Sequence, residues 1–117
     1  MPAEQLAITT EPLHARSATY IRLVGDLDAH TFEILQETLT ETFEGRGFRV
    51  ILDMTDVSYM SSAGAGVLIG ALSEIEQNDG KFVIVGLRPS VEQIFKTLGI
   101  FDVFTVVKTR ELAMTML

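Results

Sequence analysis

Short apolar segments typical of β-strands alternate with amphipathic segments typical of helices along the 117 residues of the chain. Val50-Ile51-Leu52 and Phe82-Val83-Ile84-Val85 are apolar without interruption, as expected for inner strands that are covered on both faces. Strands that are joined through helices run parallel, with right-handed crossovers. We therefore predict a single α/β domain over residues 1–117.

Three segments carry apolar residues at every third or fourth position, which predicts three helices: Asp28 to Gly45, Ser62 to Asn78, and Pro89 to Leu98. Asp28 is expected to cap the first of them, and Thr109 to cap a fourth, short helix that ends at Leu117. The remaining segments are predicted strands: two between Leu6 and Leu27 that form a hairpin with loop residues at Glu11-Pro12 and Arg16-Ser17, then Phe48 to Met54, Phe82 to Val85, and Phe101 to Val107. The prediction is a mixed, mostly parallel sheet of about five strands with about four helices.

The chain has 16 acidic and 9 basic residues, a net charge of −7, and no cysteine. An acidic surface repels nucleic acids and anionic lipids, which argues against both as partners and favours proteins with basic patches. Without cysteine there are no disulfides and no thiolate metal sites, which fits a reducing compartment. No apolar run is long enough to span a bilayer, and Met1–Gln5 does not have the character of a signal peptide, so we expect a cytoplasmic protein.

The most unusual segment runs from an apolar strand, through a short polar loop, into Ser61-Ser62-Ala63-Gly64 at the start of a helix. One interpretation is that Ser61 or Ser62 only caps this helix and that the nearby glycines only permit close packing. The alternative is that Ser62 accepts a phosphate. Helix N-termini stabilise negative charge, and a phosphoserine adds about −1.5 to −2 charge to an exposed surface.

The turns that precede the first two predicted helices follow parallel strands, so they are expected at the same edge of the sheet, where α/β folds form sites. Asp28 and Ser62 are therefore expected to be neighbours. The predicted partner-binding residues at this edge are acids, serines and glycines: Asp26, Asp28, Ser61, Ser62, Gly64 and Gly66. The two glycines are expected to let a partner approach the backbone.

The segment Asp53–Gly66 resembles the signature of STAS domains, in particular of the bacterial anti-sigma factor antagonists. Gly25-Asp26-Leu27-Asp28 is similar to the Gly-x-Leu-Asp element of that family, and Arg88 to Phe104 is similar to its closing helix and strand. The resemblance covers nearly the whole chain in the family's order. It departs from the family at two positions, where Ser61 stands in place of the usual aspartate and Ala63 in place of a second hydroxyl.

The resemblance implies a regulator that is not an enzyme and that needs no cofactor. In the family, the unphosphorylated antagonist binds an anti-sigma factor that is also a serine kinase, which frees the sigma factor. Phosphorylation of one serine ends this binding, and a metal-dependent serine phosphatase restores it. Ser62 matches the phosphorylated serine by position, and Ser61 is the alternative acceptor. STAS domains also regulate anion transporters and lipid-transport ATPases, so that role is a second alternative.

Other site chemistries fit the sequence less well. Gly64 to Gly70 has the spacing Gly-x-Gly-x-x-x-Gly rather than that of a dinucleotide fingerprint, although a nucleotide or small-anion site at this helix start stays an alternative. The sequence does not indicate a serine hydrolase, because it lacks the Gly-x-Ser-x-Gly elbow of such enzymes. A metal site built from His30, Asp26 and Asp28 is unfavourable, because residues of one turn rarely converge on an ion. We predict no metal site.

Overall fold

The computed structural model describes residues 6–117, so the prediction that Met1–Gln5 is not a signal peptide concerns residues outside the described part. Five strands form one sheet in the order of the chain: β1 (Ala7–Leu13), β2 (Ala18–Leu27), β3 (Arg49–Met60), β4 (Lys81–Val85) and β5 (Thr105–Val107). β1 is antiparallel to β2, and the other three neighbouring pairs are parallel. The prediction of a mixed, mostly parallel sheet is confirmed.

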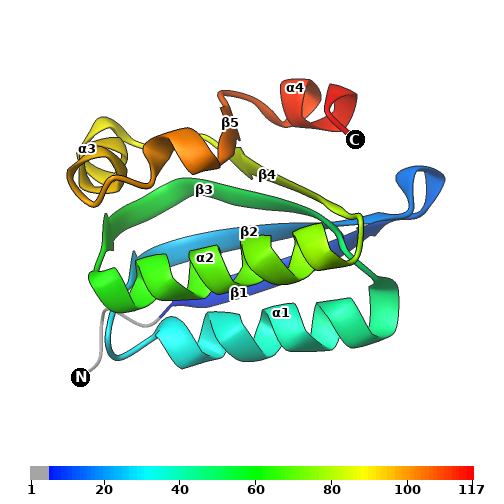
Figure 1. Cartoon of the computed structure of the whole chain (residues 1–117), viewed down its shortest axis with the longest axis horizontal. Helices are drawn as coiled ribbons and strands as arrows, with labels where there is room; N and C mark the ends of the chain where they lie inside the picture. The colour runs from blue at the N-terminus through cyan, green and yellow to red at the C-terminus, as the bar shows by residue number, and fades with distance from the viewer. Residues whose placement is uncertain (1–5) are drawn as a thin grey trace.

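Four helices accompany the sheet: α1 (Phe32–Arg46), α2 (Ser62–Gln77), α3 (Pro89–Thr97) and α4 (Arg110–Thr115). α1 and α2 lie side by side along one face (Figure 1), where Leu35 and Leu68 are fully buried in the main core together with Phe95 of α3. α4 covers part of the opposite face and buries Ala113 in a second, smaller core cluster that also contains Ile51 of β3. The inner strands are therefore covered on both faces, as their apolar sequences predict.

The hairpin of β1 and β2 is confirmed, but its loop is shorter than predicted. Glu11 and Pro12 belong to β1, where Pro12 pairs with Thr19, and the connection is a 3₁₀ helix, His14–Arg16, followed by Ser17. Pro12 is tolerated because β1 is an edge strand, which needs backbone hydrogen bonds on one side only.

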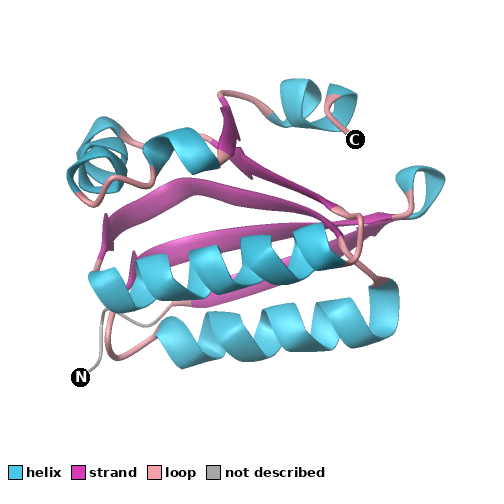
Figure 2. Cartoon of the chain, in the orientation of Figure 1, coloured by secondary structure: helices cyan, strands magenta, loops and turns pink. Residues whose placement is uncertain are grey.

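The second half of β3 corrects the prediction of a polar loop, because it is a strand (Figure 2). Its pairing with β2 contains two bulges. Between Arg22 and Val24 the paired β3 positions advance by three for two on β2, and between Gly25 and Asp26 they advance by two for one. Each shift inserts one extra residue into β3. The buried residues of this half therefore recur at every third position instead of every second: Met54, Val57 and Met60.

The C-terminal part also differs from the prediction of one strand over Phe101 to Val107. A 3₁₀ helix occupies Phe101–Val103, and β5 begins at Thr105. This turn brings the buried ring of Phe104 edge-on to Phe95, with 5.7 Å between the ring centroids. Leu98, which the sequence places on the apolar stripe of α3, is 42% exposed, because the helix ends there.

Candidate functional site

The serine turn, Ser61–Gly64, lies where β3 runs directly into α2. Ser61 is the N-cap residue: its backbone is extended, and its hydroxyl accepts a long hydrogen bond of 3.4 Å from the Gly64 N–H. Ser62 is the first residue of α2 and is exposed, whereas Ser61 is half-buried. The two serines therefore differ in role, since the capping contact engages Ser61 and leaves the side chain of Ser62 at the surface.

The end of β2 and the turn that leads from it to α1, residues 26–31, lie beside the serine turn. The Ser61 N–H donates a hydrogen bond of 2.9 Å to the Leu27 carbonyl, and Leu27 pairs with Met60 in the sheet. Asp26, one residue earlier, pairs with Tyr59. The prediction that the turns after β2 and β3 are neighbours is confirmed at the level of the backbone.

Asp28 does not cap α1 in the predicted way, because the helix begins only at Phe32. Its carboxylate accepts a hydrogen bond of 2.9 Å from the His30 N–H, within the turn. Thr31, which sequence reasoning missed, organises this turn. It is buried, and its hydroxyl donates to the Asp26 carbonyl at 2.7 Å and accepts from the Asp28 N–H at 2.9 Å. Asp26 and Asp28 are both half-buried at the edge that carries Ser62.

The two glycines of the predicted partner-binding set differ sharply. Gly64 is buried, and a Cβ atom there would lie 2.7 Å from the Leu27 Cγ and 2.8 Å from the Leu27 carbonyl oxygen. Gly64 therefore lets α2 approach the turn after β2, and its expected role of admitting a partner is corrected. Gly66 is exposed, and a Cβ atom added there would meet nothing within 4 Å, so it alone matches that role.

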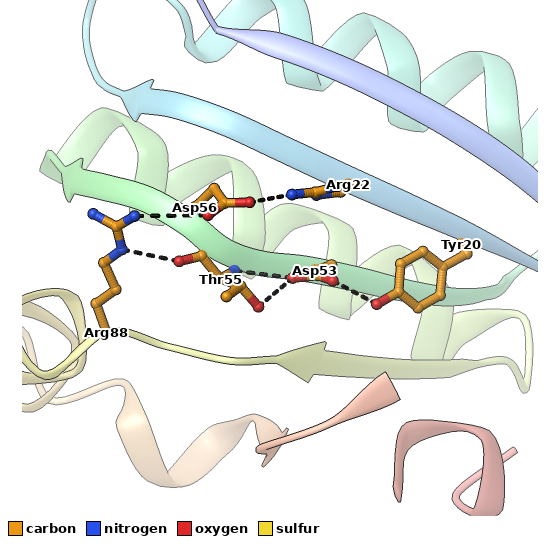
Figure 3. Close-up of polar contacts among 6 residues, drawn as sticks. All are labelled: Tyr20, Arg22, Asp53, Thr55, Asp56 and Arg88. Carbon is orange, nitrogen blue, oxygen red and sulfur yellow. Dashed lines mark hydrogen bonds and ion pairs between the residues drawn. The ribbon is translucent and has the colours of Figure 1, made fainter. Parts of the chain in front are cut away.

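A polar cluster lies on the outward side of the β3 bulges, and the sequence did not predict it (Figure 3). Asp56 forms an ion pair with Arg22 of β2, and Arg88, which precedes α3, lies 3.7 Å from its other carboxylate oxygen. Arg88 also donates hydrogen bonds of 2.9 Å to the Thr55 carbonyl and 3.2 Å to the Ser58 hydroxyl. The cluster thus links residues 55–58 in the second half of β3 to β2 and to the segment that precedes α3.

A second part of this cluster joins Tyr20 to Asp53. The Tyr20 hydroxyl donates a hydrogen bond of 2.5 Å to Asp53, whose other oxygen accepts from the N–H and the hydroxyl of Thr55. Burial, together with the hydrogen bond to Asp53, raises the pKa of Tyr20 far above its usual value. Burial alone would raise the pKa of Asp53, but the hydrogen bonds from Thr55 and Tyr20 outweigh it and hold that pKa below its usual value.

We expect Tyr20→Phe to lower the free energy of unfolding by about 1 kcal/mol at pH 7, a small value for a charged hydrogen bond because Asp53 is partly exposed. The lowered pKa of Asp53 means that its contribution is present above the ordinary aspartate pKa and is lost as the pH falls through the folded-state pKa. The difference between the two proteins should therefore shrink below about pH 4. Urea unfolding at pH 7 and below about pH 4 measures this difference in the free energy of unfolding. The variant Tyr59→Phe, at an exposed tyrosine, is the control. A difference that is the same at neutral and acid pH would contradict this assignment.

Residues 9–113 of the chain match the family model of the STAS domain. The chain belongs to the STAS domain family. Over 86 residues, this STAS domain is 31% identical to the anti-sigma-B factor antagonist of Listeria monocytogenes, and the match covers 74% of this chain and 75% of that protein.

Two solved structures of an anti-sigma factor antagonist share the fold of this STAS domain. The unphosphorylated form of SpoIIAA is 28% identical, with a TM-score of 0.77 over 92% of this chain and 93% of the other. The phosphorylated form of SpoIIAA from Bacillus is 26% identical, with a TM-score of 0.71 over 93% and 97% of the two chains. Within the STAS domains, the chain belongs with the anti-sigma factor antagonists, which are non-catalytic regulators.

Among residues 6–117, no three histidine, aspartate or glutamate side chains gather in a way that could hold a metal ion. In the same part of the chain, no helix combines the length and the apolar character that crossing a bilayer requires.

Proposed function

We propose that this STAS domain is an anti-sigma factor antagonist that is switched by phosphorylation of Ser62. In its unphosphorylated form it binds an anti-sigma factor that is also a serine kinase, and a phosphate on Ser62 releases it. A serine phosphatase then restores binding. We place this exchange in the cytoplasm. The proposal is supported by the relatives that are anti-sigma factor antagonists and by the exposed position of Ser62 at the first residue of α2.

The location of Ser62 suits a charge switch. Ser62 begins a helix of 16 residues, whose N-terminal amides and dipole stabilise an anionic group without a change of fold. SpoIIAA gives a precedent, since it has been solved in both phosphorylated and unphosphorylated forms. Ser61 is the less suitable acceptor, because its hydroxyl caps the helix and its side chain is half-buried.

The exposed face of α2 supports a protein partner at this site. Ser62 begins a row of exposed residues along the helix that carry no charge: Ser62, Gly66, Ile69, Gly70 and Ser73. Ile69 is 39% exposed. An uncharged row on a chain of net charge −7 suits contact with another protein, because charged residues are depleted in the buried part of interfaces. A phosphate on Ser62 would place about −1.5 to −2 charge at the end of this row.

Phosphate mapping tests the assignment of the acceptor. We expect incubation with the anti-sigma factor kinase of the same organism and ATP to add one phosphate, which mass spectrometry locates at Ser62. Ser62→Ala should abolish the modification. Ser61→Ala should retain it, although the loss of the cap costs about 1 kcal/mol of stability. Phosphate at Ser61 alone would reassign the acceptor, and phosphate at neither serine would overturn the switch.

A further inference from the structure

A pocket of about 610 Å³ lies at the carboxyl ends of β4 and β5, beside Thr55 and Asp56 in the middle of β3, and we call it the strand-end pocket. Its apolar lining consists of four half-buried side chains: Leu87, Phe101, Val106 and Val107. The volume is within the range of small-molecule sites, and this edge of a parallel sheet is where α/β folds bind ligands. Neither serine of the serine turn lines it.

Two acids line the strand-end pocket, and both are neutralised by neighbouring cations. Asp56 forms its ion pair with Arg22, and Glu92 pairs with Lys96 at 3.0 Å along α3. The charge of these carboxylates is therefore offset before a ligand enters.

Two cations of the same pocket keep binding capacity for an anion. Lys108 is exposed and has no carboxylate within ion-pair distance among residues 6–117. Arg88 is held in place by its hydrogen bond to the Thr55 carbonyl and by Asp56 at 3.7 Å (Figure 3), and it also donates to the Ser58 hydroxyl. The two hydrogen bonds use two of the five N–H donors of a guanidinium. Arg22 and Lys96 balance the charges of Asp56 and Glu92. Arg88 and Lys108 therefore leave a local surplus of positive charge, in a chain whose net charge is −7.

We propose that the strand-end pocket binds a small organic anion, with one carboxylate or phosphate group on an apolar body. Arg88 and Lys108 contact the anionic group, since a guanidinium and an ammonium are the side chains best suited to it. Phe101 and Val106 contact the apolar body, and burying it adds a hydrophobic contribution that an inorganic ion lacks. This site is separate from Ser62, so it does not depend on the proposed switch.

Titration of the isotope-labelled chain, followed by NMR, tests the proposal with two probes, benzoate and phenyl phosphate. We expect saturable shifts of the Gly86, Arg88 and Lys108 amides by at least one probe, with a Kd of about 1 mM or tighter. The probe that binds more tightly identifies the anionic group. Benzyl alcohol, which has the body without the charge, and inorganic phosphate, which has the charge without the body, should each bind at least about tenfold more weakly.

Lys108→Gln is the decisive variant, because Lys108 is exposed and its substitution leaves the fold intact. We expect it to weaken probe binding by about tenfold, the effect of losing one charged hydrogen bond. Lys81→Gln, at the opposite end of β4, is the matched control and should leave the affinity unchanged. No saturable shift up to about 10 mM of either probe, equal binding of benzyl alcohol, or full affinity of Lys108→Gln would overturn the proposal.

Discussion

Ser62→Asp is expected to weaken binding of the anti-sigma factor by at least about a hundredfold, because an unpaired carboxylate buried in an interface costs several kcal/mol. Ser62→Ala should bind within about threefold of the unmodified chain, since it removes only a hydroxyl at the surface. Isothermal titration calorimetry with the anti-sigma factor measures both affinities.

Ser62→Asn is the matched control for this experiment, because asparagine has the size and shape of aspartate without the charge. We expect it to bind at least about tenfold more tightly than Ser62→Asp. Folding is not the cause of the loss, since an acid in the first turn of α2 should leave the free energy of unfolding unchanged or raise it by about 0.5 kcal/mol. Equal affinities of the asparagine and aspartate variants would show that charge at this turn does not control docking.

Gly64→Ala is expected to lower the free energy of unfolding by about 2 kcal/mol, the cost of overpacking a close contact. The new methyl group would lie 2.7 Å from the Leu27 Cγ and 2.8 Å from the Leu27 carbonyl oxygen, so α2 or the turn after β2 must shift. Because the Ser61 N–H bonds to that same carbonyl, the shift should also displace the serine turn and weaken binding of the partner.

Gly66→Ala is the matched control, two residues along the same helix. A Cβ atom there meets nothing within 4 Å, so alanine should raise the free energy of unfolding by about 0.5 to 1 kcal/mol through its helix propensity. Thermal or urea unfolding distinguishes the two variants by the sign of the change. Destabilisation by both, or by neither, would contradict the packing described for Gly64.

The elements that the sequence predicts well are those in which burial follows a simple period. Val50–Leu52 and Phe82–Val85 are apolar on both faces of the sheet, and Leu35, Leu39 and Phe43 recur at helical spacing and are buried in α1. The start of α2 was also predictable, because serine followed by small residues is a strong capping signal.

The second half of β3 was not predictable from alternation, because its two bulges change the period of burial from two to three. The sequence of residues 55–59 therefore predicts a polar loop. It gives no indication of the cluster of Arg22, Asp56 and Arg88 on the outward side of the bulges. Its members come from segments more than thirty residues apart, as the separations of 34 for Arg22 and Asp56 and 33 for Arg88 and Thr55 show. Only the three-dimensional pairing brings them together.

The close contact between Gly64 and Leu27 could not be predicted from the sequence either. Glycine near a helix start suggests access for a partner, and only the fold shows that another part of the same chain occupies that space. The role of Thr31 in organising the turn before α1 could not be predicted for a related reason. Asp28 is the better capping residue by composition, but its carboxylate accepts from the His30 N–H inside the turn, and α1 begins only at Phe32.

The most direct test compares the affinity of one chain for its anti-sigma factor before and after stoichiometric phosphorylation at Ser62. We predict that the phosphate lowers the affinity by at least about a hundredfold and that phosphatase treatment restores it. Equal affinity of the two forms, measured in the same buffer, would contradict the proposal that charge at the head of α2 controls docking.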